Sequence, residues 1–319
     1  MLRSIFISLS KISWAQRAIS KGKFAWKLAS RFIAGENKDS ALRVVAELNS
    51  QGLLATLDYL GEHAQTIDAA KGAVNKVLVL LDDIQSAGLK ANVSIKLTQL
   101  GLILDEEFCF NHLLTILAKA QENDNFIRID MEDSSLTEKT LEFLHQVMVR
   151  GYSNVGIVIQ SYLYRSEKDT RALAASRVPV RVVKGAYRES EQVAYPDKGD
   201  VDRNFDLLTS ILLEAALQED TPLHSHNGRF PPLPAIATHE VKRILFAREK
   251  AKQLNLTPDR YEFQMLFGIR RNLQHELVKA GYFVRVYVPY GTHWYPYFMR
   301  RLAERPANVW FIIDNLFRP

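Results

Sequence analysis

The chain has 319 residues and a mass of 36.4 kDa. Hydrophobic residues make up 47% and charged residues 24% of it, a composition that excludes wholesale disorder. The single cysteine, Cys109, excludes both an internal disulfide framework and a cysteine-rich zinc site. Because it lies within an apolar run, we expect Cys109 to be a small buried side chain rather than a nucleophile.

The net charge of +5 is concentrated at the N-terminus. Residues 1–35 contain seven Lys or Arg and no Asp or Glu, which leaves 34 basic and 36 acidic residues elsewhere. The rest of the chain is therefore almost neutral, and nothing in it indicates a nucleic-acid-binding patch.

We interpret residues 1–50 as a basic helical arm and residues 51–319 as the catalytic body. The arm is interrupted by Lys and Arg too often to span a membrane. It also lacks the unbroken apolar core of a secretory signal, although an acid-free, basic start resembles a mitochondrial transit peptide. We expect its apolar face to pack against the body, an arrangement compatible with contact to an anionic membrane surface.

After residue 35, short β-rich runs alternate with amphipathic stretches. Strands are predicted at 53–60, 93–98, 126–131, 155–160, 180–186, 235–239, 261–267 and 284–290. Helices are predicted at 66–87, 105–122, 137–150, 201–218, 241–255, 272–280 and 297–305, with a weaker signal at 168–176. Eight such units favour a (βα)8 TIM-like barrel with the final helix over the carboxyl ends of its strands.

Two other site types find little support. The sequence has no G-x-G-x-x-G or Walker motif, which argues against a Rossmann or P-loop nucleotide site. Residues 219–234 are rich in proline and are predicted to form a loop. We interpret His224 and His226 as solvated loop residues rather than metal ligands, and we expect no metal site.

Polar residues near the strand ends indicate where chemistry takes place in a barrel. Cations are seldom buried without a partner or a function. Lys96, Arg181 and Lys184 therefore predict an anionic ligand in the upper barrel, although Arg181 begins its strand and could be exposed at the lower rim. For Asp58 we favour a turn or helix cap. A structural role and a ligand contact are equally compatible with His239.

The last helix carries a second group of polar residues. Tyr297, Arg300, Arg301 and Glu304 are spaced so that they share one helical stripe. A surface helix with ion pairs would explain this pattern in isolation. Because the helix follows the eighth strand, we instead expect the two guanidinium groups to bind a carboxylate and Glu304 to orient Arg301.

These segments resemble the flavin-dependent proline dehydrogenases, in particular the small monofunctional bacterial type. The resemblance rests on SIKLTQLG (94–101), RIDMEDS (128–134), VIQSYLYR (158–165), VRVVKGAYRES (180–190), ATHE (237–240), EFQMLFGIR (262–270) and RVYVPYGTHWYPYFMRRLAERPAN (285–308). They follow the family order over nearly the whole chain. The family fold is a distorted (βα)8 barrel. The loop at 219–234 departs from the tighter connection of many members, so the resemblance does not extend to this loop, which it would place beside the cofactor site.

The resemblance implies that FAD is the cofactor and L-proline the substrate. The reaction would oxidise the C5–N bond to give Δ1-pyrroline-5-carboxylate, the first step of proline catabolism, with electrons passing on to a membrane quinone. It implies a cytoplasmic protein, peripheral at the inner face of the cell membrane if the arm binds there.

The resemblance also assigns roles to individual residues. Lys96, Arg300 and Arg301 would bind the proline carboxylate, with Glu304 holding Arg301 and with Tyr287 and Tyr297 packed against the ring. Asp130 would lie at the reacting centre beside Lys96, and Arg181 near flavin N5. The remaining cofactor contacts would come from Met131, Gln160, Lys184, Gly185, Ala186, Thr238 and His239, with Gln264 and Leu266 as weaker candidates. The missing Cβ of Gly185 would permit close approach of the flavin.

Two functions of other classes remain open from the residues alone. A Schiff-base aldolase would use Lys96 or Lys184 as its amine nucleophile, but would not need the arginine pair. A membrane- or partner-binding scaffold would use the basic arm and the proline-rich loop, and would likewise not need the paired arginines.

Overall fold

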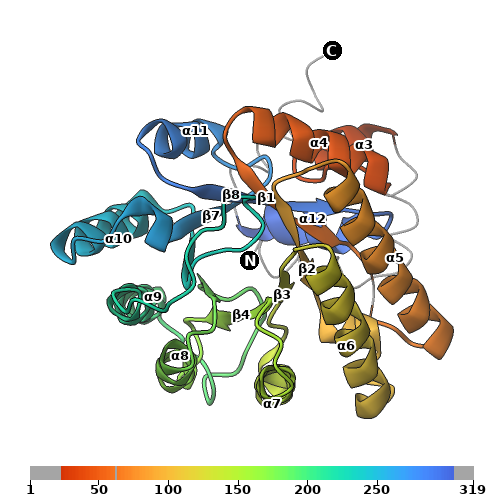
Figure 1. Ribbon diagram of the computed structural model, residues 1–319, viewed down its shortest axis with the longest axis horizontal. Coiled ribbons are helices and arrows are strands. Elements are labelled where there is room, and N and C mark those ends of the chain that lie inside the picture. Colours follow the sequence, from red (N-terminus) through yellow and green to blue (C-terminus); the bar gives the residue numbers. More distant parts are fainter. Residues whose placement is uncertain (1–22, 62, 305–319) are drawn as a thin grey trace.

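The computed structural model describes residues 23–61 and 63–304. Its strands are β1 (Leu54–Tyr59), β2 (Ala91–Ile95), β3 (Ile127–Ile129), β4 (Val155–Gln160), β5 (Val180–Val183), β6 (Pro234–Ala237), β7 (Glu262–Leu266) and β8 (Val284–Tyr290). They pair in parallel in chain order, and β8 pairs with β1 to close the barrel. The predicted (βα)8 TIM-like fold is therefore confirmed (Figure 1).

The helices of the described ranges are α3 (Lys23–Ala29), α4 (Lys38–Ser50), α5 (Ile67–Ser86), α6 (Glu106–Glu122), α7 (Thr137–Val149), α8 (Ser166–Ala175), α9 (Lys198–Ala215), α10 (Val241–Gln253), α11 (Arg271–Lys279) and α12 (Trp294–Glu304). Of these, α3 and α4 precede β1, helices α5 to α11 surround the barrel, and α12 follows β8 and lies over one end of it (Figure 1). Short 3-10 helices are η1 (Leu97–Leu100), η2 (Ser134–Leu136) and η3 (Pro258–Arg260). No helix in the described ranges is long and apolar enough to cross a membrane.

Local sequence signals set several helix starts. The side chains of Asn37, Thr66 and Asp105 each accept a hydrogen bond from a backbone N–H in the first turn of α4, α5 and α6. The predicted strands at 93–98, 126–131 and 180–186 are shorter in the structure, because the chain turns away from the barrel at the polar residues that end them.

The arm contributes to the body through α3 and α4. Ala41, Val45 and Leu48 of α4 join the main hydrophobic core that surrounds the barrel. Leu28 and Ala29 of α3 pack with Trp294, Phe298 and Leu302 of α12 in a second core. The expected packing of the arm is confirmed for these described helices, whereas Trp14 and the other residues before 23 lie outside them. The division at residue 50 remains a prediction.

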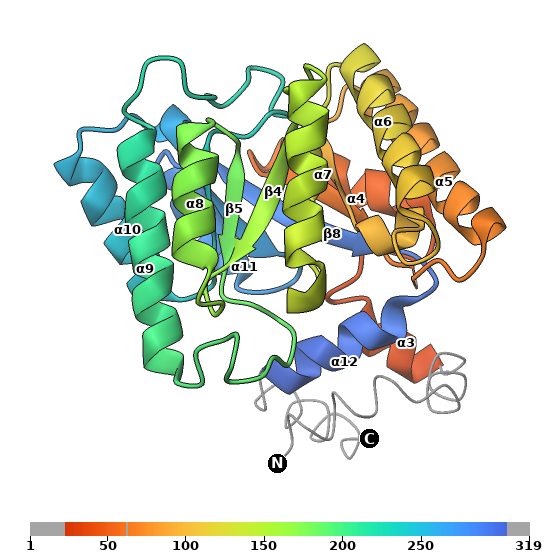
Figure 2. The ribbon, with the colours of Figure 1, turned by 90° about the horizontal axis from the view of Figure 1, so that it is seen from below.

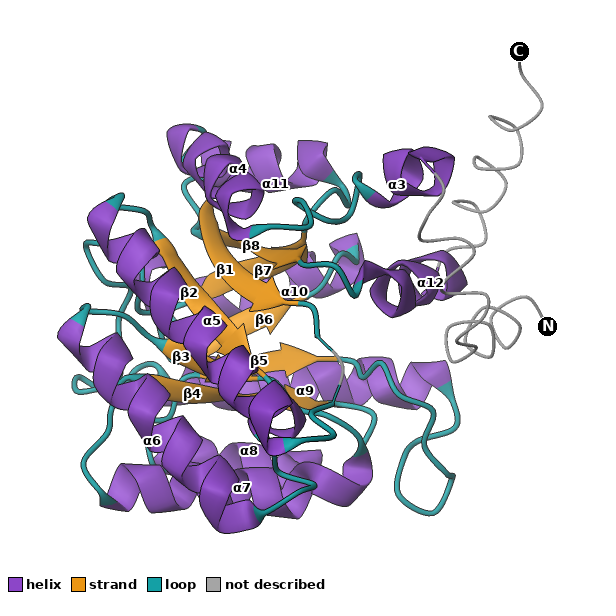
Figure 3. Ribbon diagram, turned by 90° about the vertical axis from the view of Figure 1, so that its right-hand side faces the viewer, coloured by secondary structure: helices purple, strands orange, loops and turns teal. Residues whose placement is uncertain are grey.

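The same contact fixes α12 at one end of the barrel. The rings of Trp26 and Trp294 are 5.5 Å apart, and the Trp294 indole donates to Glu36 at 3.1 Å. Leu60, directly after β1, packs into this second core. Figures 2 and 3 show α3 and α12 side by side at the end toward which the strands point. We call this end the mouth and the opposite end the floor.

Candidate active site

Three side chains form a hydrogen-bonded group inside the upper barrel. One oxygen of Asp130 accepts from the Arg181 guanidinium at 2.7 Å, and the other accepts from the Tyr287 hydroxyl at 2.7 Å. Burial, together with the charge of Asp130, raises the pKa of Tyr287 well above its usual value, so the hydroxyl keeps its proton. The alternative that Arg181 is exposed at the lower rim is wrong, and its predicted place inside the upper barrel is confirmed, because the residue is only 4% exposed and reaches Asp130.

Lys96 lies beside this group and is held by two carboxylates. Its ammonium is 2.7 Å from Asp58 and 3.8 Å from Asp130. Burial opposes the charge, but Asp58 and Asp130 outweigh it and raise the pKa of Lys96 above its usual value. The prediction of a turn or cap for Asp58 is wrong, because its side chain points into the barrel and is 2% exposed. We call Asp58, Lys96, Asp130, Arg181 and Tyr287 the mouth cluster.

Two further residues at the mouth were not singled out from the sequence. Glu132 is buried and accepts from the backbone N–H and the hydroxyl of Thr98, at 3.1 and 2.5 Å. Tyr187 is 37% exposed as a whole residue, but desolvation of its hydroxyl by the surrounding protein raises its pKa to about 12, against the opposing charges of Lys96 and Arg300. Both residues lie in segments that carry the resemblance, RIDMEDS and VKGAYRES, which is the signal that could have found them.

The predicted stripe on α12 is formed near the mouth. The helix begins at Trp294, three residues before the predicted start, and Tyr297 and Arg301 are buried on it. The Arg301 guanidinium stacks over the Tyr297 ring at 5.0 Å. Arg300 is half-buried, and its charge acts on the hydroxyl of Tyr187. Glu304 ends the helix, but its side chain lies outside the described part of the chain.

The predicted cofactor residues follow β3, β4, β5 and β6. Met131 is buried, and Gln160 donates to the Glu132 carbonyl at 2.7 Å. The carbonyl oxygen of Gln160 is buried without a hydrogen-bond partner among the described residues. The Thr238 hydroxyl accepts from the Glu240 backbone N–H, and His239 Nε2 accepts from the Leu266 N–H at 2.9 Å. His239 therefore has a structural role, which leaves its predicted ligand contact untested.

The segment after β5 holds three more of these residues. Lys184 pairs with Asp202 and, at 2.6 Å, with Glu240, so its charge is already neutralised within the protein. Ala186 is exposed. Gly185 has a φ of +120°, and a Cβ there would lie 2.5 Å from the Tyr162 ring. Close packing on Tyr162 is therefore a sufficient reason for this glycine.

The proline-rich loop lies at the floor and not beside the mouth. Arg229 of this loop is 6% exposed and donates to the carbonyls of Leu89 and Asn123, and its own carbonyl accepts from Asn92 at 2.9 Å. The loop joins α9 to β6, so it meets the amino ends of the strands. The loop that departs from the family pattern therefore lies at the end of the barrel opposite the mouth, and not beside the predicted site residues.

The interpretation of His224 as a solvated loop residue is wrong. Its side chain is 5% exposed and stacks on Phe283 with ring centroids 3.9 Å apart. His226, in contrast, is exposed. No group of three or more possible metal ligands occurs within residues 23–61 and 63–304. Cys109 is buried as predicted, and burial raises the pKa of its thiol to about 12.

A buried ion pair lies between the loop and the mouth cluster. Arg285 of β8 pairs with Glu262 of β7 through two contacts of 2.8 and 3.0 Å, and both residues are fully buried. Arg128 is buried beside them and donates to the carbonyls of Ile157 and Pro179. We call Arg128, Glu262 and Arg285, with His224 and Arg229, the floor cluster. A charge inside an apolar strand is the signal that selected Arg181, and it is equally present at Arg128, Glu262 and Arg285.

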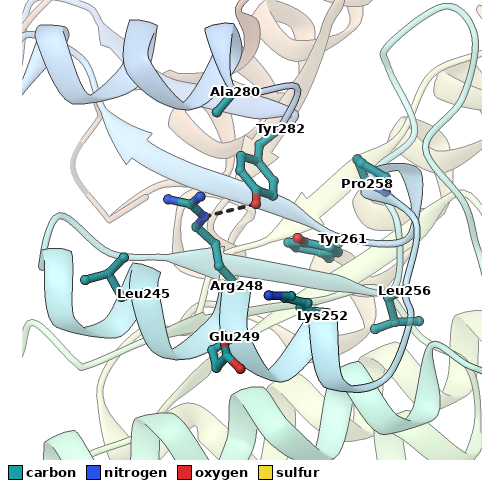
Figure 4. A pocket seen from close by; sticks show the side chains of 9 residues that line it. All are labelled: Leu245, Arg248, Glu249, Lys252, Leu256, Pro258, Tyr261, Ala280 and Tyr282. Carbon is teal, nitrogen blue, oxygen red and sulfur yellow. Dashed lines mark hydrogen bonds between the residues drawn. The ribbon is translucent and has the colours of Figure 1, made fainter.

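One cavity opens on the outer flank of the barrel, between α10 and the turn from α11 to β8 (Figure 4). Arg248 donates to the Tyr282 hydroxyl there at 3.0 Å. The cavity is lined by residues of α10, of the segment that joins α10 to β7, and of the turn from α11 to β8, namely Leu245, Arg248, Glu249, Lys252, Leu256, Pro258, Tyr261, Ala280 and Tyr282. The cavity therefore has no part in the mouth.

The chain is similar to known proteins over its whole length. Residues 41–313 match the family model described as proline dehydrogenase. "Proline dehydrogenase 1" of Bacillus subtilis is 39% identical over 321 residues and covers 100% of both chains. "Proline dehydrogenase" of Deinococcus radiodurans is 41% identical, covering 92% of this chain and 91% of that protein.

A solved structure is similar in fold as well. Proline utilization A of Bdellovibrio bacteriovorus, inactivated by N-propargylglycine, matches with a TM-score of 0.77 and 28% identity. The match covers 88% of this chain but only 33% of that much longer one. Taken with the family match over most of the chain, these similarities show that the protein belongs to the proline dehydrogenase family.

Proposed function

We propose that the chain oxidises L-proline at the C5–N bond to Δ1-pyrroline-5-carboxylate, the first step of proline degradation, with FAD as its cofactor and a quinone as the final electron acceptor. The observation that carries the proposal is the mouth cluster beneath the arginines of α12. Family membership supports it independently, because the relatives that match over their full length are proline dehydrogenases.

The mouth has the charges needed to bind a carboxylate. Lys96 is held protonated by Asp58 and Asp130, and Arg301 is fixed over Tyr297 by stacking. Two guanidinium groups on α12 can bind the proline carboxylate through charge-assisted hydrogen bonds, with Glu304 as the proposed partner of Arg301. Tyr297, buried on the same helix, would pack against the substrate ring and exclude water.

The residues around the mouth also fit a flavin. The carbonyl oxygen of Gln160 has no described partner, although a buried acceptor requires a donor, and a ring N–H of the cofactor can supply it. When bound, FAD supplies a two-electron acceptor for the hydride that leaves C5. Met131, Gln160, Arg181, Lys184, Gly185, Ala186, Thr238 and His239 are the residues proposed to hold it.

The mouth cluster then controls charge and protonation. The substrate amine must be neutral before the C5–H bond breaks, because its lone pair stabilises the iminium product. Arg181, fixed by Asp130, would present a positive charge to the electron-rich reduced centre. The Tyr287 hydroxyl donates a hydrogen bond to Asp130, and its ring would face the substrate.

The basic arm is proposed to bring the protein to the membrane that holds the quinone. Lys27 of α3 is exposed while Leu28 and Ala29 are buried against α12, so this part of the arm has a cationic outer side. Such a side can bind an anionic surface peripherally. We accordingly propose a cytoplasmic protein at the inner face of the membrane.

A spectrum recorded without oxygen, with and without L-proline, tests the proposal. Purified protein should be yellow, and proline should bleach the flavin absorbance. Colourless protein that borohydride traps with a carbonyl substrate would instead establish the Schiff-base aldolase. The structure argues against that chemistry, because Lys96 and Lys184 are both held by carboxylates and an amine nucleophile must be neutral.

A further inference from the structure

A continuous line of polar contacts runs from the floor cluster to the mouth cluster. Gln264 of β7 lies between them. Its amide nitrogen donates to Glu262 at 2.5 Å, and its carbonyl oxygen accepts from Arg181 Nε at 2.5 Å. Gln264 is 4% exposed and Glu262 is fully buried. Gln264 therefore joins the buried ion pair directly to a residue of the candidate active site.

The donors and acceptors fix the direction of this line. Glu262 is ionised, because Arg285 outweighs the opposing effect of burial and lowers the pKa of the carboxyl group. An ionised carboxylate only accepts hydrogen bonds, so the amide N–H of Gln264 must face Glu262. The carbonyl oxygen of the same amide is then turned toward Arg181, where an acceptor is needed.

The lower end of the line is rigidly anchored. Arg285 holds both oxygens of Glu262 and also donates to the carbonyls of Ala55 and Gly228, each at 3.0 Å. These carbonyls belong to β1 and to the proline-rich loop of residues 219–234 at the floor. The position of Glu262 is thus set by three separate parts of the backbone.

The upper end fixes the plane of the Arg181 guanidinium. Nε donates to Gln264, while Nη1 donates to Asp130 at 2.7 Å and to the Ser94 hydroxyl at 3.2 Å. Gln264 and Asp130 lie on opposite sides of the group, on β7 and after β3. Loss of the Gln264 contact would leave Nε without its acceptor, so that only the contacts of the two Nη atoms with Asp130 and Ser94 would still hold the plane of the group.

We propose that Glu262 and Gln264 are positioning residues, which hold Arg181 in its catalytic orientation through a hydrogen-bonded line that begins at the floor of the barrel. The effect on turnover rests on the proposed function, in which Arg181 faces the reacting centre. The existence of the hydrogen-bonded line does not rest on the proposed function, so the line and its effect on turnover can be tested separately.

The structural part is tested by NMR of the protein as purified, with 15N-labelled arginine. The Nε–H signal of Arg181 is assigned from its loss in Arg181→Lys. In Gln264→Leu we expect this signal to shift and its hydrogen exchange to accelerate at least about tenfold, since about 1.4 kcal/mol of protection is lost with the hydrogen bond. An unchanged signal would overturn the proposal.

Asn92→Leu is the matched control. Asn92 is also a buried amide inside the barrel, but it donates to the Arg229 carbonyl and not to the line. Asn92→Leu should lower the stability of the protein as Gln264→Leu does, but it should leave the position of the Arg181 signal unchanged. If both variants move the signal equally, the effect is general loosening of the barrel and the proposal fails.

The functional part is tested by measuring kcat and KM for proline separately in each variant. Gln264→Leu should lower kcat about tenfold and leave KM within about twofold, because Arg181 acts on the reacting centre and not on the carboxylate. Asn92→Leu should change neither. A native protein that does not oxidise proline would refute the proposed function, and the NMR result would still decide whether the line exists.

Gln264→Glu supplies a second variant if the leucine variant does not fold. A carboxyl group at this position lies between the negative charge of Glu262, which raises its pKa, and the positive charge of Arg181, which lowers it, and while it is protonated it still donates to Glu262 and accepts from Arg181. Arg285 on β8, His224 on the floor loop and Arg128 on β3 are the other titratable groups that act on Glu262. As the pH rises the proton is lost, and kcat relative to the native protein should fall; a constant ratio would contradict the proposal.

Discussion

The mouth and floor clusters contain the same kinds of charged residues, but the two clusters have different roles. At the floor, Arg285 is satisfied entirely by Glu262 and by backbone carbonyls, and Arg229 by carbonyls and one amide side chain. The floor cluster holds three arginines and one carboxylate, and its surplus is met largely by backbone carbonyls, although Nε and Nη2 of Arg128 have no hydrogen-bond partner among the described residues. At the mouth, Lys96 and Arg181 balance Asp58 and Asp130, and Arg300 and Arg301 of α12 add further positive charge. A buried charge whose partners are backbone groups supports structure, whereas a surplus of one sign on the helix at the mouth indicates a ligand of the other sign.

The comparison predicts that the largest effect of a single substitution on stability lies at the floor. Arg285→Met leaves Glu262 buried without its partner and should lower the free energy of unfolding by about 3–5 kcal/mol. Urea denaturation of the purified variants measures this. Arg301→Met at the mouth serves as the contrast and should cost far less; equal losses would remove the distinction between the two regions.

The second effect is on substrate binding. Arg301→Met should weaken proline binding by roughly 10- to 150-fold, the equivalent of about 1.5–3 kcal/mol for a charge-assisted hydrogen bond. KM for proline and the dissociation constant of a carboxylate inhibitor report it. Arg171→Met is the control, since Arg171 is exposed on α8 and its ion pair within the described residues is with Glu167 of the same helix. Unaltered affinity in Arg301→Met would favour the scaffold hypothesis.

The third effect is a pH dependence of stability that arises at the floor. Burial lowers the pKa of His224 to about 4, from 6.5 in a free side chain. The unfolded chain therefore takes up this proton first, so stability present above pH 6.5 is lost as the pH falls toward 4. His224→Phe keeps the stacking on Phe283 and should remove about 1–3 kcal/mol of this loss. Melting curves at pH 4.5 and 7.5 test it, with the exposed neighbour variant His226→Phe expected to behave like the native protein.

The smallest effect concerns the rate at the mouth. Because the substrate amine must be neutral, the rate of flavin reduction by proline at low substrate concentration should rise through mildly alkaline pH. The limit is about tenfold per pH unit while the free amine remains a minor species. Stopped-flow measurements without oxygen provide the profile. A flat profile from neutral to alkaline pH would mean that deprotonation of the amine does not control the reaction.

Much of the fold could be predicted from the sequence because it depends on periodicity. Eight apolar strands alternating with amphipathic helices leave few arrangements, and all eight strands are present in the structure. The stripe of Tyr297 and Arg301 was likewise predictable, since helical spacing alone puts them on one side. The basic arm could be identified by charge, and the structure adds that α3 holds α12 in place.

Tertiary structure alone decided which charges meet. Asp58 and Lys96 are 38 residues apart, and Arg181 and Gln264 are 83 apart, so their contacts depend on how strands pair and which way each side chain faces. The same holds for His224 and the proline-rich loop of residues 219–234. The composition of this loop indicates solvent exposure, but His224 stacks on Phe283 and Arg229 donates to a buried carbonyl at the floor. The sequence alone determined that charged residues lie inside the strands. Closure of the barrel determined which of these residues pair with each other and which surround the mouth, because the register between strands, and not the spacing along the chain, decides which side chains meet.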